Sequence, residues 1–105
     1  LILAHWGGGL AFYAMNPHCA SKMKNVWFDT AASPLIYSNK IWRAAVEMVG
    51  ADRILFGTDY PLKLYPSKSG VPSIKCLVDE VEESGLTQEE QTQIFRGTAE
   101  TLFDL

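Results

Sequence analysis

The chain has 105 residues, a formal net charge of −3 and a hydrophobic fraction of 48%, enough for one small domain with a buried core. Its nine basic residues are scattered, which excludes the electrostatic footprint of a nucleic-acid-binding protein, and no apolar run approaches the roughly 20 residues needed to span a bilayer. Cys19 and Cys76 lack C-x-x-C spacing and fit reduced packing thiols, so we expect a soluble, cytoplasmic protein.

The chain begins with an apolar run, 1–4, whose short and uniform character predicts a buried strand. His5 follows directly, and Trp6 and three glycines, 7–9, come next. Consecutive glycines permit positive φ angles and a close approach of the backbone to a ligand, although a flexible turn explains them too. The pairing of a strand-end histidine with a glycine turn makes His5 a candidate site residue.

A loop or short helix before Pro17 and a helical turn after it are predicted next. His18 has polar neighbours, which favours a solvated surface histidine over a ligand. A second strand is predicted over 26–28, with Asp29 at its carboxyl end. Because an aspartate there often caps the following loop, we interpret Asp29 as structural or, at most, adjacent to the substrate.

The strongest signal lies in residues 54–61, an apolar run followed by Gly-Thr-Asp-Tyr-Pro. Residues 54–56 predict a fully buried parallel strand whose carboxyl end delivers Asp59 into a crevice, where α/β proteins place their chemistry. A neutral imidazole at His5 and a carboxylate at Asp59 are ligand types for Zn²⁺ and similar ions. Two such groups make an incomplete site, because catalytic zinc usually has three protein ligands.

Helices are predicted between and after the strands. Apolar residues recur at one-face spacing in 41–49, which Gly50 ends, and in 74–81, which Ser73 can cap. A capping box at 87–90 predicts the start of the last helix. The order strand, helix, strand, helix, strand, helix, helix is typical of a parallel α/β sheet with right-handed crossovers.

The segments between these elements are predicted to be loops. Residues 31–37 are expected to connect the second strand to its helix, and Ser38 or Asn39 to cap that helix. Residues 62–72 predict a polar loop over the site. The acidic cluster within 79–83 predicts an exposed helix face rather than a metal site.

The residues alone leave three classes of function open. The chain could come from a metal-dependent enzyme, or it could be a non-catalytic α/β fragment or interaction module in which His5 and Asp59 are relics. A receiver-like domain with Asp59 as phosphoacceptor is weaker, because it needs an acidic pair after its first strand and residues 1–9 contain no carboxylate.

Residues 50–61 resemble the last barrel strand of the amidohydrolase superfamily, in its metal-dependent hydrolase and decarboxylase branch (the amidohydrolase 2 group). Residues 1–9 resemble the sixth strand of that group with its histidine and glycine turn, 26–30 resemble the seventh, and 87–105 resemble the closing helix. The resemblance implies an α/β fold made of the last three βα units of a TIM (β/α)8 barrel plus a closing helix, so that 1–105 is the C-terminal part of a single metal-dependent hydrolase domain. Because such a barrel takes about 250 residues, we expect an incomplete barrel with open strand edges, an inactive isolated chain and a homo-oligomer.

The resemblance also implies roles for the candidate residues. Asp59 is expected to bind a divalent metal, and His5 to stand beside it as acid, base or electrostatic partner. We expect zinc, with manganese and magnesium as alternatives, and a small organic acid or amide as substrate, undergoing C–N or C–O hydrolysis or decarboxylation. Thr98 stands where the closing helix of the family commonly has an asparagine, a departure that affects a packing hydrogen bond more than the chemistry.

Overall fold

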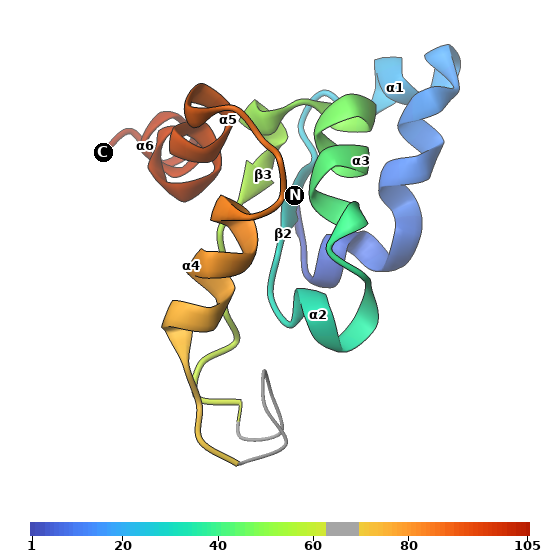
Figure 1. Ribbon diagram of the computed structural model, residues 1–105. Coiled ribbons are helices and arrows are strands. Elements are labelled where there is room, and N and C mark those ends of the chain that lie inside the picture. The colour runs from blue at the N-terminus through green and yellow to red at the C-terminus, as the bar shows by residue number, and fades with distance from the viewer. Residues whose placement is uncertain (63–69) are drawn as a thin grey trace.

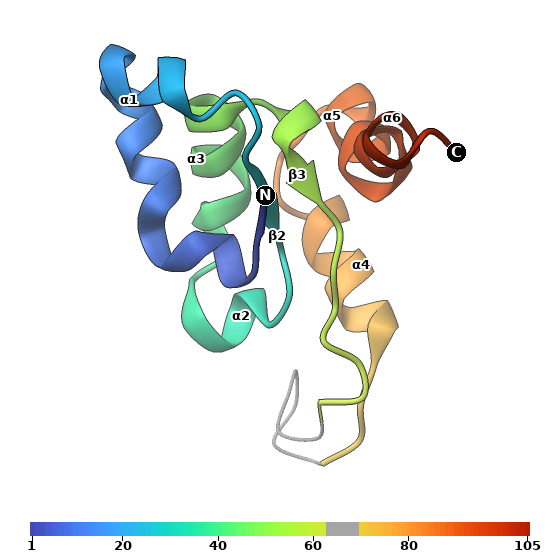
Figure 2. The same ribbon diagram turned by 180° about the vertical axis from the view of Figure 1, so that it is seen from behind.

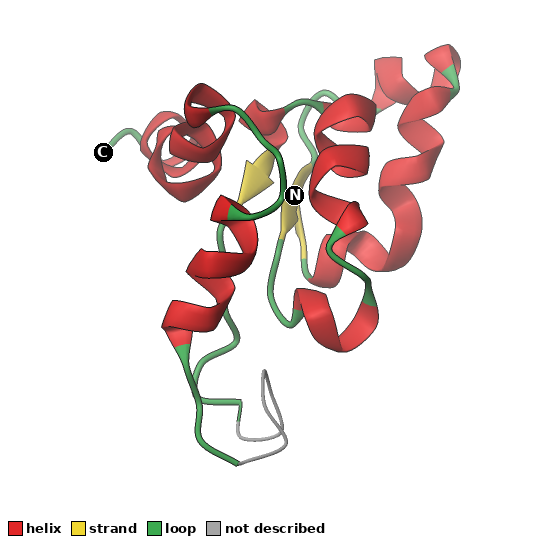
Figure 3. Cartoon of the chain, in the orientation of Figure 1, coloured by secondary structure: helices red, strands yellow, loops and turns green. Residues whose placement is uncertain are grey.

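The computed structural model describes residues 1–62 and 70–105, so the larger part of the predicted loop 62–72 lies outside the described residues (Figure 1). The elements, in chain order, are β1 (Ile2–Leu3), the 3-10 segment η1 (His5–Met15), α1 (Pro17–Lys22), β2 (Trp27–Asp29), α2 (Ser33–Ile36), α3 (Lys40–Val49), η2 (Ala51–Arg53), β3 (Ile54–Leu55), α4 (Ile74–Glu82), α5 (Gln88–Thr92), the π-helical turn η3 (Gln93–Gly97) and α6 (Thr98–Phe103). Short strands lie in the middle, with helices around them (Figure 3).

The three strands form one parallel sheet in the order β1-β2-β3, which confirms the predicted parallel α/β arrangement. The register pairs Leu3 with Phe28 and Phe28 with Ile54, so these three side chains share a face. Phe28 and Ile54 are fully buried, and Leu3 packs against them. Each strand is two or three residues long, so the predicted strands 1–4 and 54–56 are shortened at their ends. The prediction that 1–4 is buried is wrong, because β1 is the edge strand among the described residues and Ile2 is 43% exposed.

Helices on either side of the strands complete a single core. Figures 1 and 2 show η1 and α3 together on one side and α4, α5 and α6 on the other. Trp42 of α3 is 1% exposed and meets Trp6 edge to face, with ring centroids 5.1 Å apart, so the apolar face predicted over 41–49 lies in the core. The other buried members of this core are Ala11, Ala45, Val81, Leu86 and Ile94.

Of two connecting segments, the one around Pro17 agrees with its prediction and the one over 31–37 differs from it. The short helix predicted before Pro17 and the helical turn predicted after it are both present, although η1 is 3-10 helical only beyond the left-handed backbone of residues 6–9. The Asn16 side chain caps α1 by accepting hydrogen bonds from the backbone N–H groups of His18 and Cys19. The loop predicted over 31–37 contains the short helix α2, because Pro34 at its start has a φ already suited to a helix.

The helix ends follow the sequence signals closely. Gly50 ends α3 with a φ of 89°, the Ser73 hydroxyl accepts from the Cys76 N–H at 3.3 Å, and both halves of the capping box at Thr87 and Glu90 form. Asn39 occupies the N-cap of α3 without capping it, because its side-chain amide donates instead to the Glu80 carbonyl oxygen of α4.

The last helix is interrupted by the π-helical turn η3. The Ile94 carbonyl oxygen there accepts a hydrogen bond from the Phe56 N–H at 3.2 Å, which satisfies part of the outer edge of β3. Thr98 donates its hydroxyl to the Ala51 carbonyl oxygen at 3.0 Å, so the threonine provides a bond between the closing helix and the start of β3. The residues that flank β3 are therefore held by one backbone carbonyl and one threonine hydroxyl of the closing helical segment.

The acidic residues within 79–83 were predicted to form an exposed face of the helix. This prediction is only partly correct for α4. Glu82 is exposed, but Asp79 and Glu80 are half-buried. Burial raises the pKa of Glu80, and the nearby Trp42 indole partly opposes that shift.

Contrary to the prediction, the cysteines are not both packed in the interior. Cys76 is exposed, and both cysteines are free thiols. Within 1–62 and 70–105, every helix is too short or too polar to cross a membrane.

An ion pair between α3 and α5 makes part of the stability depend on pH. Arg43 donates two hydrogen bonds to the Glu90 carboxylate, at 3.0 and 2.9 Å, and thereby lowers the pKa of Glu90. A carboxyl whose pKa is depressed in the folded state contributes stability at neutral pH and loses it as the pH falls. We expect Glu90→Gln to lower the melting temperature at pH 7, and the difference from wild type to shrink below about pH 4, while Glu89→Gln in the same helical turn changes little. Thermal unfolding between pH 3 and 8 measures this, and a constant difference at every pH would contradict it.

Candidate functional site

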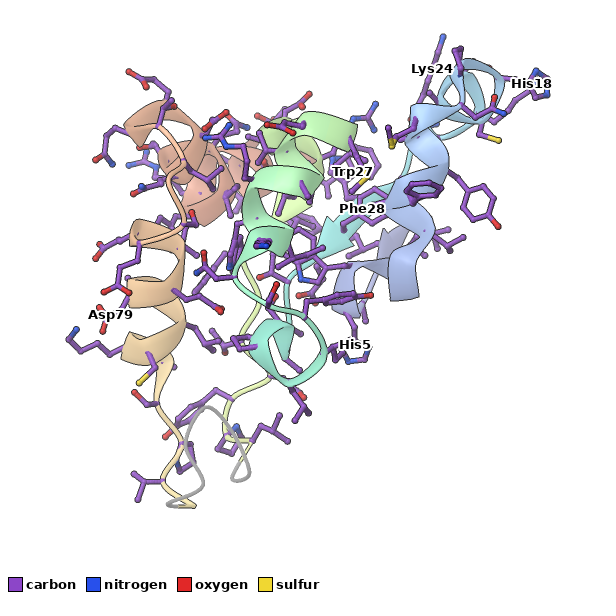
Figure 4. All side chains as sticks on the ribbon, turned by 45° about the vertical axis from the view of Figure 1, so that its right-hand side comes forward. His5, His18, Lys24, Trp27, Phe28 and Asp79 are labelled. Carbon is purple, nitrogen blue, oxygen red and sulfur yellow. The ribbon has the colours of Figure 1, made fainter. Side chains whose placement is uncertain are left out.

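The carboxyl ends of the three strands point to one end of the molecule, and each is followed by a segment with polar residues. His5 follows β1, Thr30 follows β2, and Asp59 lies four residues after β3. Figure 4 shows His5 close to α2, whereas His18 lies on α1 at the far end. The exposure of His18 confirms its interpretation as a solvated histidine.

The backbone in these segments adopts a conformation that side chains rarely tolerate. His5, Trp6, Ala32 and Asp59 have φ angles between 51° and 58°, in the left-handed region, and each follows one of the three strands. Such a conformation costs roughly 1–3 kcal/mol per residue and persists only where surrounding contacts impose it. Strain of this kind concentrates at functional sites, so the carboxyl end of the sheet is the candidate site.

The glycine turn after His5 has the predicted conformation. Gly7, Gly8 and Gly9 have φ angles of 65°, 59° and 94°, which confirms that the chain uses these glycines for a left-handed turn. The left-handed stretch begins earlier than the sequence indicated, at His5 and Trp6. This turn leaves His5 exposed to solvent and buries the next residue, Trp6, which is 1% exposed.

Buried hydroxyl groups link the three strand ends. The Trp6 indole donates to the Ser33 hydroxyl at 2.6 Å, and that hydroxyl donates to the Thr30 carbonyl oxygen at 2.6 Å. The Thr30 hydroxyl accepts from the Gly57 N–H at 2.9 Å and donates to the Gly57 carbonyl oxygen at 3.0 Å. Neither Thr30 nor Ser33 was predicted to belong to the site, although the position of Thr30 directly after a buried strand was a signal for the first of them.

Asp29 has the structural role that the sequence predicted. Its Oδ1 atom accepts the Ala31 N–H at 2.7 Å and so caps the turn after β2. The same carboxylate fills the space beside Gly57, where an added Cβ would lie 2.0 Å from Oδ1. Gly57 is thus required by close packing against Asp29, a role that could not be predicted from the residues near it in the chain.

The groups that could act on a ligand are His5 and Asp59. Both are exposed, so water and small solutes reach the imidazole and the carboxylate. Within residues 1–62 and 70–105, no three His, Cys, Asp or Glu side chains lie close enough together to hold a metal ion. An imidazole and a carboxylate fit a divalent metal by ligand type, but further ligands would have to come from outside the described residues.

A hollow lies at the opposite, amino end of the strands. Its volume is about 420 Å³, and it is lined by Lys24, Asn25, Trp27, Asp52, Arg53, Gln93, Thr98, Thr101 and Leu102. Arg53 lies over the Trp27 ring, 5.2 Å from its centroid, and donates to the carbonyl oxygens of Lys24 and Val26. The Arg53 guanidinium is therefore engaged by the protein itself and is not left to bind a ligand. Since His5 and Asp59 also lie at the other end of the strands, we do not take this hollow as the candidate site.

An amidohydrolase family model, Amidohydro_2, matches residues 1–105, so the chain belongs to this amidohydrolase family. The L-fucono-1,5-lactonase of Burkholderia multivorans (strain ATCC 17616 / 249) is 28% identical over 109 residues, covering 98% of this chain and 36% of the lactonase. The chain thus spans about a third of the length of this curated relative, and the family is one of enzymes.

Solved structures share the fold. A dihydroxybenzoic acid decarboxylase from Polaromonas sp. JS666, with bound manganese and the inhibitor 2-nitroresorcinol, superimposes with a TM-score of 0.75 at 23% identity, over 99% of this chain and 33% of that one. An amidohydrolase from Burkholderia multivorans with bound HEPES superimposes with a TM-score of 0.65 at 22% identity, over 100% and 44%. The small parallel sheet and its helices therefore match part of the TIM-barrel amidohydrolases.

Proposed function

We propose that residues 1–105 are the C-terminal part of a metal-dependent barrel enzyme that hydrolyses a C–O bond in a small lactone. The observation that carries this proposal is the placement of His5 and Asp59, on left-handed backbone, after parallel strands of an amidohydrolase-family chain. Lactone hydrolysis comes first because the curated sequence relative is a lactonase. The wider sequence-based expectation, hydrolysis of a C–N or C–O bond, includes this reaction.

Each residue has a distinct role in this proposal. The Asp59 carboxylate would hold a divalent ion, zinc or otherwise manganese or magnesium, together with ligands from the rest of the enzyme. Such an ion supplies Lewis-acid polarisation of a carbonyl oxygen and makes water more acidic. The His5 imidazole would take a proton from the attacking water at a ring nitrogen and return it to the leaving oxygen, because histidine exchanges protons near neutral pH.

Decarboxylation is the second candidate. It is favoured by the match of nearly the whole chain to a dihydroxybenzoic acid decarboxylase at a TM-score of 0.75. The same two residues would serve it, Asp59 by holding the ion and His5 by delivering a proton to the carbon that loses carbon dioxide. A non-catalytic module with relic residues is the remaining alternative.

Metal removal and two substrate classes test the proposal on the full-length protein. Sugar-acid 1,5-lactones are assayed by acid release in a pH-stat, and dihydroxybenzoates by release of carbon dioxide. We expect lactone turnover that a chelator abolishes and that added Zn²⁺, Mn²⁺ or Mg²⁺ restores. Carbon dioxide release alone would replace the first candidate by the second. Absence of both reactions in protein with a full complement of metal would favour the non-catalytic alternative.

A further inference from the structure

Each candidate catalytic residue, His5 and Asp59, has a near neighbour in the chain that is hydrogen-bonded to the same short segment, residues 30–33. Trp6 follows His5 in the chain, and Gly57 precedes Asp59 by two residues. Segment 30–33, which follows β2, binds both of these flanking residues through side chains. It is thus the physical link between the loop after β1 and the loop after β3.

The hydrogen bonds of segment 30–33 restrict the positions of both Trp6 and Gly57. The Thr30 hydroxyl engages both the N–H and the carbonyl oxygen of Gly57, at 2.9 and 3.0 Å, and the Thr30 N–H donates to the Leu55 carbonyl oxygen at 3.1 Å. The Ser33 hydroxyl connects the Trp6 indole to the Thr30 carbonyl oxygen, with both distances 2.6 Å. Five residues, Trp6, Ser33, Thr30, Leu55 and Gly57, therefore share one continuous network that joins all three strand ends.

This network is buried while the residues it supports are exposed. Thr30, Ser33 and Trp6 are between 0% and 1% exposed. Water is excluded from the bonds that join Trp6, Ser33 and the Thr30 carbonyl, and the bonds between Thr30 and Gly57 are partly buried, so loss of either hydroxyl leaves its partners poorly satisfied. His5 and Asp59 are exposed and have φ angles of 51° and 56°, which external support must maintain.

We propose that Thr30 and Ser33 are positioning residues, whose buried hydroxyls set the placement of His5 and Asp59 relative to each other. This inference rests on the proposed function, since it assigns to these hydroxyls the geometry of that same site. The turn after Asp59 is closed by its own contacts, a bond from the Leu62 N–H to the Asp59 carbonyl oxygen and one from the Tyr60 N–H to the Thr58 hydroxyl. What Thr30 fixes is therefore the start of that turn, at Gly57.

Thr30→Val tests the proposal in the metal-loaded full-length enzyme, because valine keeps the shape and removes the hydroxyl. We expect kcat to fall by roughly 10- to 100-fold with little change in KM, since small displacements of catalytic groups have effects of this size. Metal affinity, measured by competition with a chelator, should fall about 10-fold, as for other groups that orient metal ligands. Thr30→Ser should restore both quantities, and Ser33→Ala should lower kcat more than metal affinity.

Thr98→Val is the matched control. Thr98 is also 1% exposed, and its hydroxyl also binds a backbone carbonyl, that of Ala51, but at the amino end of β3. We expect it to lower the melting temperature as much as Thr30→Val does and to leave kcat and metal affinity unchanged. If Thr30→Val behaves like Thr98→Val in all three measurements, the hydroxyl is structural only and the proposal is wrong.

Amide hydrogen exchange separates this proposal from the proposed function. In Thr30→Val the Gly57 amide should exchange faster than in wild type, and in Ser33→Ala the Trp6 indole N–H should do so, whether or not the protein turns over a substrate. An inactive wild type with slow exchange at both sites would reject the proposed function and keep the linkage. Unchanged exchange in the two variants would overturn the linkage itself.

Discussion

Asp59→Asn in the full-length protein is expected to abolish metal-dependent turnover and to lower metal affinity by roughly 100-fold or more. Asparagine keeps the shape of aspartate but loses the charge that a divalent ion binds. Loss of a group that only orients a metal ligand costs about 10- to 100-fold, so loss of a ligand should cost at least as much. Metal content by elemental analysis and affinity by chelator competition measure the effect.

His5→Ala separates the roles of the two residues. We expect kcat to fall by about 10²- to 10⁴-fold, the usual contribution of a general acid or base, with metal content close to that of wild type. His18→Ala and Asp79→Asn are the matched controls, because both residues lie away from the strand ends (Figure 4), and Asp79 forms only a surface ion pair with Lys75. Equal metal loss in His5→Ala and Asp59→Asn would make His5 a metal ligand, and normal metal content in Asp59→Asn would remove Asp59 from the site.

Local signals in the sequence predicted the order of the elements well. The apolar run 54–56, the cap at Ser73 and the capping box from Thr87 to Glu90 each depend on residues within a few positions of one another. Such short-range physics is visible in one sequence, because a hydroxyl three residues before a glutamate finds the same partners in most contexts. The parallel sheet then follows from the alternation of strands and helices.

Features that depend on distant contacts were not predictable in the same way. In the π-helical turn 93–97, the Ile94 carbonyl oxygen accepts a hydrogen bond from the Phe56 N–H, 38 positions away in the chain. The residues near Ile94 do not predict this turn. Likewise, Glu80 belongs to an acidic cluster that looks solvated in sequence, yet the packing of α4 against Trp42 buries it partly. Tertiary contacts override local patterns in both places.

In the candidate site, too, some residues could be predicted from their neighbours in the chain and others depend on distant contacts. His5 and Asp59 were identified from their places after apolar strands, and the structure puts both after parallel strands. The hydroxyls of Thr30 and Ser33, by contrast, gain meaning only from Trp6 and Gly57, each 27 positions away from its partner. Residues that could contact a ligand were thus easier to find than residues that hold them.

Gly57→Ala is expected to destabilise the protein although the φ angle of Gly57 is not in the left-handed region. The new Cβ would lie 2.0 Å from Oδ1 of Asp29 and 2.8 Å from its Cγ, so the carboxylate must move. The backbone of Gly57 cannot yield easily, because Thr30 holds its N–H and its carbonyl oxygen. Overpacking costs about 1–3 kcal/mol, and the lost bond from the Ala31 N–H adds about 1 kcal/mol, so we expect the free energy of unfolding to fall by roughly 2–4 kcal/mol.

A double-mutant cycle shows whether Asp29 is the cause. In the Asp29→Ala background the clashing atoms are gone, so Gly57→Ala should cost about 1–3 kcal/mol less there than in the wild-type background. Gly97→Ala is the matched control, because the atoms nearest its added Cβ belong to the far end of the flexible Gln93 side chain, which can move at the expense of its hydrogen bond to the Thr98 hydroxyl. Denaturant unfolding of the full-length protein measures all four members of the cycle. Costs for Gly57→Ala that are the same in both backgrounds would mean that Asp29 does not occupy this space in solution, and the cap that it provides to Ala31 would then have to be placed differently.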